Sequence, residues 1–350
     1  MSMSNDGSFL LPADWSTHRS TTILWPGRAD VWDPHMEEGR LEVARLAELL
    51  ARSELVHLVV DPRMAHTVPS TLRPSVQCIV MPIDDAWARD TCPLSVFDTT
   101  GREVAVSFRF NSWGRKFMPY DSDALIGRRL ASEFDLPFVS SPLVLEGGAI
   151  AVDGEGTALI VERSVLNRNR NAGVDKATVE RALFELLGVD VVVWFEHGLL
   201  DDVDTDGHVD NVAAFTGPAQ VVCQVAGRDR EDERGLLENL RRLQRARDAQ
   251  GRQFEVIELP WLPYSPLGAS RPAPYVNFYF FNDGLAVPVV GAPSDDLALD
   301  LFQGLTSRRV TAICARALGY GGGGVHCVTQ PRFILADDAQ VERTADEQND

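Results

Sequence analysis

Short apolar segments and single amphipathic segments alternate along the whole 350-residue chain, and no other feature restricts its fold as strongly. In the amphipathic segments, apolar residues recur every three or four positions among residues that favour helices, which predicts helices. The shorter segments are continuously apolar or alternate with polar residues, which predicts strands. The predicted helices are Met36–Arg52, Asp123–Phe134, Lys176–Leu187, Glu231–Gln250 and Asp295–Ser307.

The predicted strands alternate with these helices about five times over the chain. Several strands end in a turn rich in Pro, Gly, Trp and acidic residues, although the turns share almost no side-chain identity. This rhythm indicates repeated strand–helix units around one centre, and therefore an α/β fold. The predicted strands are His57–Val60, Val104–Phe110, Ala158–Val161, Val189–Phe195, Gln220–Val225, Phe254–Leu259, Tyr275–Phe281 and Val325–Gln330.

The chain is long enough for two average domains or for one large domain. No Ser/Gly-rich or Pro-rich stretch interrupts its middle, and 45% of the residues are apolar, which is ample for one core. We therefore predict a single domain over residues 1–335. Residues 336–350 are acidic and nearly free of large apolar side chains, which predicts a disordered tail.

The net charge of the chain limits which ligands it can bind, and the pattern of its cysteines indicates its cellular compartment. With 51 acidic and 33 basic residues, the net charge of −18 disfavours nucleic acid and permits a small cationic ligand. The first nine residues lack an apolar signal core, and no apolar run is long enough to span a membrane, so we expect no membrane partner. The five cysteines are scattered and include no C-x-x-C pair, which indicates free thiols in a reducing cytoplasm rather than disulfides or a structural zinc site.

The first candidate motif is a run of four glycines, Gly321–Gly324, followed three residues later by Cys327. Such a run predicts a loop whose backbone can approach a ligand closely. Cys327 then lies at the mouth of a predicted strand, a suitable place for an exposed nucleophile. The alternative is an inert, buried cysteine after a flexible turn, because free cysteine is among the most buried residue types.

The second motif, Asp201–Asn211, resembles a calcium-binding loop but has Ala213 where such a loop requires a bidentate Glu. Its more informative feature is the pair His208 and Asp210. At strand spacing, an imidazole and a carboxylate two residues apart point to the same face. The alternative is a solvated acidic turn followed by a core histidine.

The third motif, Asp84–Asp90, brings a carboxylate and an indole together. Asp85 and Trp87 lie two residues apart, so in an extended segment they would form one wall suited to a cation. We interpret Arg89 and Asp90 as a structural ion pair. Glu146 follows a predicted strand and precedes two glycines; taken alone, such a carboxylate is usually solvated surface.

Together these residues meet the requirements of chemistry on a guanidinium group. Carboxylates in bidentate geometry bind such a planar cation best, and Asp85 and Asp210 can supply them. Attack on its central carbon needs a soft nucleophile, Cys327. An acid/base must protonate the departing ammonia and then deprotonate water, a role for His208 oriented by Glu146. Nearby carboxylates should raise the pKa of the Cys327 thiol and keep His208 protonated.

In this order, the motifs resemble those of the agmatine deiminase family, in the peptidylarginine-deiminase-like bacterial branch of the guanidine-modifying pentein enzymes. The likeness extends from the N-terminus to about Gln330. The matching motifs are Leu11–Trp15 with His18, Trp25-Pro26, Asp85-x-Trp87-x-Arg89-Asp90, Phe110–Gly114, Glu146–Gly148, Val152–Gly156, Leu166–Asn171, Gly207-His-x-Asp-Asn211, Tyr275–Tyr279 and Gly321-Gly-Gly-x-x-His-Cys327.

The resemblance implies a single-domain pentein, a five-bladed α/β propeller with pseudo-fivefold symmetry, and often a homodimer. It also implies that Cys327 forms an amidino-cysteine intermediate, that His208 is the general acid/base with Glu146 as its partner, and that Asp85 and Asp210 hold the guanidinium. No metal or organic cofactor is implied, because the second substrate is water.

The implied reaction is agmatine plus water giving N-carbamoylputrescine and ammonia, a step of arginine and polyamine metabolism. Three alternatives remain: a deiminase of another guanidino compound, an amidinotransferase, and a non-catalytic guanidine- or polyamine-binding protein. The sequence departs from the family pattern at Arg115 and Lys116, where a second glycine is common, and in a shorter Pro260–Pro274 segment. The basic pair predicts extra positive charge near the far end of the substrate.

Overall fold

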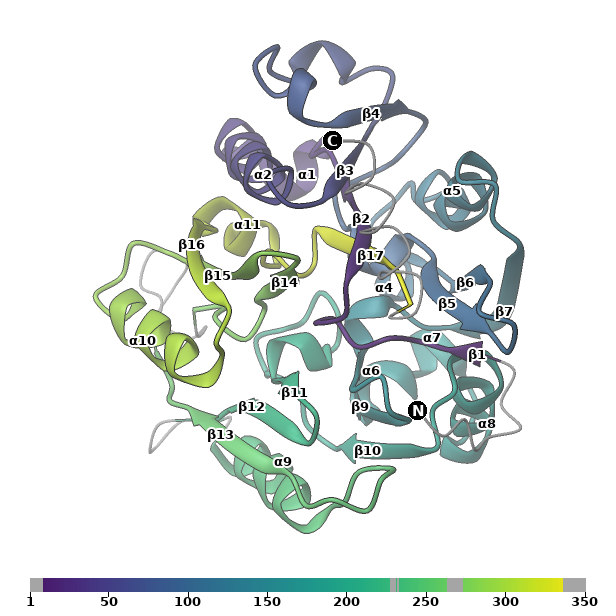
Figure 1. The fold of residues 1–350 in the computed structure, drawn as a ribbon, viewed down its shortest axis with the longest axis vertical. Coiled ribbons are helices and arrows are strands. Elements are labelled where there is room, and N and C mark those ends of the chain that lie inside the picture. Colours follow the sequence, from purple (N-terminus) through teal and green to yellow (C-terminus); the bar gives the residue numbers. More distant parts are fainter. Residues whose placement is uncertain (1–8, 227–230, 232, 263–272, 336–350) are drawn as a thin grey trace, which may run out of the picture.

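The computed structural model describes residues 9–226, 231, 233–262 and 273–335. Its strands form five separate small sheets within this part of the chain, arranged around a common centre (Figure 1). In bonding order the sheets are β1 (Phe9–Leu10), β5 (Leu94–Asp98), β6 (Glu103–Arg109) and β7 (Phe138–Val144); β10 (Val191–Phe195), β9 (Thr157–Val161) and β8 (Ile150–Val152); β11 (Ala213–Gly217), β12 (Gln220–Gln224) and β13 (Glu255–Leu259); β14 (Tyr279–Phe281), β15 (Gly284–Val289) and β16 (Arg309–Cys314); and β17 (Thr329–Phe333), β2 (His18–Leu24), β3 (Leu55–Val60) and β4 (Gln77–Val80).

Each sheet repeats one topology, in which an antiparallel pair is extended by a parallel strand after a helical crossover. Thus β5 and β6 pair antiparallel, and the chain returns through a helix to place β7 parallel to β6. The same order holds for β8–β9–β10, β11–β12–β13 and β14–β15–β16. In the remaining sheet the two ends of the chain meet, because β17 pairs antiparallel with β2 before β3 follows in parallel. The predicted α/β fold of repeated strand–helix units is confirmed.

The five crossover helices lie on the outside of this arrangement (Figure 1). They are α2 (Met36–Leu50), α5 (Ile126–Glu133), α8 (Lys176–Leu187), α9 (Glu233–Arg245) and α10 (Asp295–Leu305), close to the predicted ranges. Shorter helical turns are α1 (Ala29–Trp32), α3 (Ala88–Thr91), α4 (Ser112–Arg115), α6 (Glu162–Val165), α7 (Arg168–Asn171), α11 (Arg316–Gly321), η1 (Ala65–Thr67), η2 (Arg73–Ser75), η3 (Asp123–Leu125), η4 (Gly147–Ala149) and η5 (Val209–Asn211).

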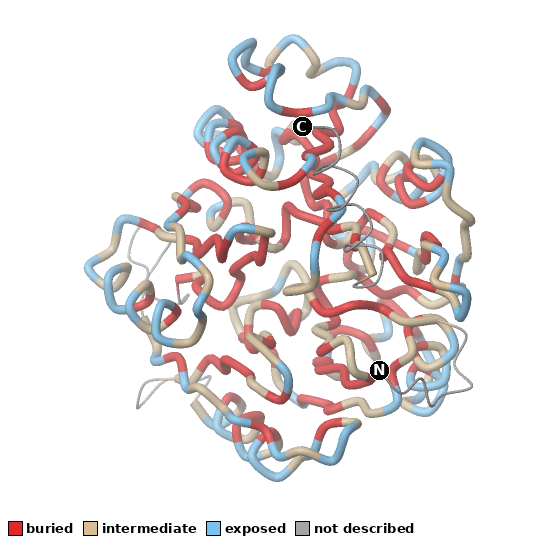
Figure 2. Tube along the Cα trace, in the orientation of Figure 1, coloured by how far each residue is buried: buried red, intermediate tan, exposed pale blue. Residues whose placement is uncertain are grey.

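Local sequence explains these helices well, and α8 is an example. The Asp175 side chain caps its N-terminus by accepting the Thr178 N–H, and Gly188 ends it in the left-handed conformation (φ 70°). Val179, Leu183 and Leu187, spaced four apart, form its buried face. Figure 2 shows the resulting pattern, with buried inner strands and exposed outer helix faces.

Two strands near the candidate site begin later than predicted, and the strand spacing assumed for His208 and Asp210 is wrong. Residues 275–278 form a turn, in which the Asn277 N–H donates to the Pro274 carbonyl, so β14 starts only at Tyr279. Residues 325–328 also turn, because the Thr329 N–H and hydroxyl bond back to preceding carbonyls, so Cys327 precedes β17. His208 caps the 3₁₀ turn η5 and is not in a strand.

None of the helices in the described ranges combines the length and apolar character needed to cross a bilayer. The predicted tail, residues 336–350, lies outside the described residues, as do residues 263–272 of the segment that is shorter than in the family. The single-domain boundary at residue 335 therefore stays a prediction.

Candidate active site

Cys327 lies in the turn before β17 and is buried at 8% exposure. Its Sγ is 3.5 Å from Asp210 Oδ2 and 3.3 Å from Asn277 Oδ1. The same Asn277 oxygen accepts the backbone N–H groups of His326 and Cys327, which fixes the turn. Burial, and then the charges of Asp210 and Asp90, raise the pKa of the thiol well above its ordinary value, in the predicted direction.

The glycine run is needed because it passes through a tightly packed space. A Cβ at Gly323 would lie 2.4 Å from the Trp87 indole and 3.1 Å from the Cys327 sulfur. A Cβ at Gly324 would lie 2.5 Å from Asn277 Oδ1. Only part of the run is the predicted loop, since Gly321 is the last residue of α11 and Gly322 ends that helix with a φ of 105°.

Asp85 and Trp87 form the predicted wall together with a second tryptophan, Trp32. The Trp32 indole N–H donates to Asp85 Oδ1 at 2.7 Å, and the two indole rings stack with centroids 5.3 Å apart. The other carboxylate oxygen, Oδ2, is buried and has no hydrogen-bond partner among the described residues. Burial raises the pKa of Asp85 to about 7.

His208 lies between two carboxylates in the buried interior. Its Nε2 is 3.6 Å from Glu146 Oε2, and its Nδ1 is 3.8 Å from Asp90 Oδ2. Burial lowers the pKa of the imidazole, but the charges of Asp90, Glu146 and Asp210 outweigh it and raise the pKa to about 9. The ring is therefore an imidazolium at neutral pH.

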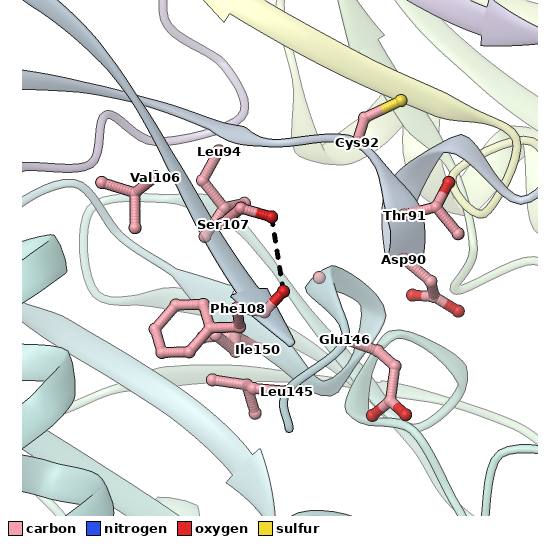
Figure 3. Close-up of a pocket in the computed structure, with 11 residues that line it drawn as sticks. Asp90, Thr91, Cys92, Leu94, Val106, Ser107, Phe108, Leu145, Glu146 and Ile150 are labelled. Carbon is pink, nitrogen blue, oxygen red and sulfur yellow. Dashed lines mark hydrogen bonds between the residues drawn. The ribbon is translucent and has the colours of Figure 1, made fainter. Parts of the chain in front are cut away.

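Glu146 is completely buried, so the surface interpretation of this carboxylate is excluded. Arg170, on α7, donates from Nε to Glu146 Oε1 at 2.7 Å. Burial raises the pKa of Glu146, but bonds and charges from His208 and Arg170 outweigh it and lower the pKa to about 2. A small cavity adjoins Glu146 and Asp90, and apolar side chains including Leu94, Phe108 and Ile150 line it (Figure 3).

Asp210 is held by a second histidine, His326, whose Nδ1 is 3.0 Å from Asp210 Oδ2. On its other side, His326 Nε2 is 3.0 Å from Asp14, and Asp14 pairs with Arg89 at 3.4 Å. Burial raises the pKa of Asp210, but His326 outweighs it, and the pKa is lowered. Asp210 Oδ1 is buried and has no hydrogen-bond partner in the part of the chain that the structure describes.

The predicted ion pair between Arg89 and Asp90 is wrong. Consecutive residues of a helical turn point about 100° apart, so the two side chains diverge on α3. Arg89 reaches Asp14, whereas Asp90 accepts the Gly148 N–H and the Trp113 indole N–H, both at 2.8 Å.

Gly148 shows how closely the catalytic candidates converge. A Cβ at this position would lie 2.8 Å from His208 Nδ1 and 2.9 Å from both Asp210 Oδ2 and Asp90 Oδ1. Asp210 of this group also contacts the Cys327 sulfur. Gly323 packs between that sulfur and the Trp87 indole, and the indole stacks on Trp32. All the predicted site residues therefore belong to one continuous cluster of contacts: Cys327, His208, Glu146, Asp85, Asp210 and Trp87.

Sequence reasoning missed several members of this cluster. Asp90 and His326 lie inside the matching motifs, next to Arg89 and Cys327. Their position beside these residues was the only sequence evidence that they belong to the site. Asn277 and Arg170 also lie inside matching motifs, but no neighbouring residue indicates their contacts with Cys327 and Glu146, which span 50 and 24 positions. Trp32 lies outside every matching motif and contacts Asp85 across 53 positions. The acidic segment 201–206 is not a set of free carboxylates, since Asp202 accepts the His208 N–H and the Thr205 hydroxyl. Among the described residues, no group of His, Cys, Asp and Glu is arranged to hold a metal ion.

Fold and site together define an α/β enzyme with a buried cysteine, an imidazolium and several carboxylates at one centre. The chain belongs to the Porphyromonas-type peptidyl-arginine deiminase family, whose model matches residues 10–332. It is 38% identical to a "Putative agmatine deiminase" of Streptomyces coelicolor, over 92% of this chain and 98% of the relative, and 34% identical to one of Legionella pneumophila, over 92% and 94%. The solved agmatine deiminase of Enterococcus faecalis superposes with a TM-score of 0.86 at 28% identity, covering 93% of this chain and 96% of that one.

Proposed function

We propose that this protein hydrolyses agmatine to N-carbamoylputrescine and ammonia through a covalent intermediate on Cys327. One observation carries the proposal: Asp85 Oδ2 and Asp210 Oδ1 are buried, and neither has a hydrogen-bond donor among the described residues. A buried, unsatisfied carboxylate oxygen is costly unless a ligand supplies the donor. A guanidinium offers N–H groups along its edges and a positive charge for both.

The binding groups suit a flat cation. The stacked indoles of Trp32 and Trp87 form an aromatic wall beside Asp85 and attract positive charge. Asp210 Oδ2 lies 3.5 Å from the Cys327 sulfur. A guanidinium held by both carboxylates presents its central carbon to the sulfur.

The substrate's charge also activates the nucleophile. Asp210 and Asp90 raise the pKa of Cys327, which disfavours the thiolate in the unliganded site. A bound guanidinium opposes these negative charges, so the thiol releases its proton to solvent when the substrate is present.

In the first chemical step, the Cys327 thiolate bonds to the guanidinium carbon and a tetrahedral adduct forms. The C–N bond to one terminal nitrogen then breaks, and His208, held as an imidazolium by Glu146 and Asp90, donates the proton that lets the nitrogen leave as ammonia. The product of this step is the amidino-cysteine with a neutral His208.

In the second step, neutral His208 takes a proton from water, and the oxygen bonds to the same carbon. The C–S bond breaks, the electron pair returns to sulfur, the hydroxyl proton of the adduct restores the Cys327 thiol, and the substituted urea departs. Atoms and charge balance, because the guanidinium and water give the urea and ammonium.

Lys116 is anchored within the protein. Its Nζ is 2.8 Å from Asp206 Oδ2 and donates to the carbonyls of Val203 and Asp204 at 2.5 and 2.9 Å. Asp206 Oδ2 also pairs with Arg170, so one carboxylate offsets only part of the charge of these two basic residues.

We further infer that the five repeated sheets are the blades of a pentein propeller and that the protein is a cytoplasmic homodimer. The repeated order of antiparallel and parallel pairs in all five sheets supports the propeller. Sedimentation velocity would test the dimer directly, since a monomer and a dimer of this 38.6 kDa chain differ twofold in mass.

A panel of agmatine, arginine, methylated arginines and guanidinobutyrate tests the function, with ammonia and the urea-type product both measured. We expect turnover of agmatine without any acceptor amine, and the Cys327→Ser variant should lose nearly all of it, because a neutral hydroxyl is a weaker nucleophile. A requirement for an acceptor amine would identify an amidinotransferase. Binding without turnover would identify a binding protein, and preference for another panel member would replace agmatine.

A further inference from the structure

The turn Ser112–Arg115 has an unusual backbone that the proposed mechanism does not use. Its four residues have φ angles of 56°, 51°, 88° and 64°, and three of them are not glycine. Side chains rarely adopt such angles, and a run of them persists only where the surrounding structure holds it. Conformations of this kind concentrate at functional sites.

Several contacts hold the turn in this conformation. The Asn111 side chain accepts the Gly114 N–H at 2.8 Å and donates to the Asn169 carbonyl at 2.9 Å. The buried Trp113 ring packs edge-on against Phe110 and Phe117, with centroids 5.1 and 5.7 Å away. As a result, the Trp113 indole N–H donates to Asp90 Oδ2 at 2.8 Å.

Asp90, which accepts the Trp113 N–H, also lies beside His208. Its Oδ2 lies 3.8 Å from His208 Nδ1, and its Oδ1 accepts the Gly148 N–H at 2.8 Å. Both side chains are almost fully buried, so the pair is shielded from water and salt.

The same turn also reaches the opposite side of the imidazole. Lys116, next to Arg115 in the chain, pairs with Asp206 Oδ2 at 2.8 Å, and Arg170 Nη1 donates to that oxygen at 2.5 Å. Arg170 Nε bonds Glu146, which faces His208 Nε2 at 3.6 Å. Two series of contacts therefore start near this turn and end at His208. One runs from Trp113 through Asp90, and the other from Lys116 through Asp206, Arg170 and Glu146.

We propose that this turn positions the His208 imidazole, with Trp113 as a positioning residue that acts through Asp90. The proposal rests on the proposed function, in which His208 transfers the protons. The indole N–H holds the Asp90 carboxylate at one angle. That carboxylate in turn keeps the proton and the orientation of the ring.

The charged groups that face His208 come from three elements. Asp90 belongs to α3, Glu146 precedes η4, and Asp210 lies in η5 beside the histidine itself. The Asp202 carboxylate accepts the backbone N–H of His208. Of the three facing carboxylates, Glu146 pairs with Arg170 and Asp210 with His326, whereas Asp90 is held by two neutral donors, the Trp113 indole N–H and the Gly148 N–H.

Two variants and one matched control test the proposal. Trp113→Phe keeps an aromatic ring and removes the indole N–H together with part of the ring, and Asp90→Asn removes the charge. Trp194→Phe is the control, because the Trp194 indole N–H also donates to a carboxylate, Glu180, at 2.7 Å, away from the site. The readouts are the His208 titration by imidazole NMR, and kcat and KM for agmatine across pH.

We expect Asp90→Asn to lower the titration midpoint of His208 by about one pH unit or more and to move the high-pH limb of kcat with it. Trp113→Phe should shift both in the same direction and lower kcat about tenfold, with KM within about twofold of the wild type. Trp194→Phe should leave the titration and kcat unchanged.

The proposal fails if Trp113→Phe has wild-type kcat and a wild-type His208 titration. If that variant does not fold, Asp90→Asn decides, and an unchanged His208 titration there also overturns the proposal. Wild-type protein with no turnover of any guanidino compound would refute the proposed function alone, since the NMR titration reports on His208 without turnover.

Discussion

A single methyl group added at Gly148 should disturb three groups of the catalytic centre at once. The Cβ of Gly148→Ala would meet His208 Nδ1 at 2.8 Å, and Asp210 Oδ2 and Asp90 Oδ1 at 2.9 Å. Non-bonded carbon contacts are most favourable at about 3.5 Å, so these three groups must move away from the new methyl group by about 0.6 to 0.7 Å. The backbone itself permits alanine, because no left-handed φ occurs at this position.

The size of the effect follows from that displacement. A misplacement of about 1 Å can cost about a hundredfold in rate, so a shift of about two thirds of that size should lower kcat about ten- to a hundredfold. Overpacking a buried site should also lower the free energy of unfolding by about 1 to 3 kcal/mol. The protein should nevertheless remain folded, since a large domain tolerates one such loss.

The assay is ammonia release from agmatine at saturating substrate, together with urea unfolding of the same preparations. Gly304→Ala is the matched control, because no atom lies within 4 Å of the Cβ that it would add. Gly304 lies in α10, and alanine there should raise the free energy of unfolding by about 1 kcal/mol or less and leave kcat unchanged. Wild-type kcat in Gly148→Ala would refute the inferred convergence of His208, Asp210 and Asp90.

Four further predictions follow from the same geometry. Asp85→Asn should raise KM for agmatine about ten- to a hundredfold, because it loses one charged hydrogen-bond partner; an unchanged KM would remove Asp85 from the binding site. A bound guanidinium should increase the thiolate fraction of Cys327, measured by ultraviolet absorbance, and a decrease would contradict the charge argument. Activity should fall as pH rises through about 9, where His208 loses its proton, and a flat profile there would exclude it as the acid. Glu146, with its pKa lowered from 4.5 to about 2, should contribute stability above about pH 4.5 that is lost as pH falls toward 2; urea unfolding of wild type and Glu146→Gln should converge in acid.

Sequence alone determined the repeated strand–helix units and the residue types that the chemistry needs. Helix α8 illustrates why, since its cap, its terminating glycine and its buried stripe all lie within fourteen consecutive positions. Helical and strand periodicity are local properties, so they can be read from neighbouring residues. The motif residues Asp85, Glu146, His208, Asp210 and Cys327 were found in the same way, each from its immediate neighbours.

Only the tertiary structure decided which of these groups touch and in what state of charge. Arg89 and Asp90 are adjacent in sequence but serve separate networks, because helix geometry directs them apart. Trp113 reaches Asp90 across 23 positions, and Asn277 reaches Cys327 across 50. Burial and the sum of surrounding charges set the pKa values of His208 and Cys327, and both depend on side chains from several sheets packed around one centre.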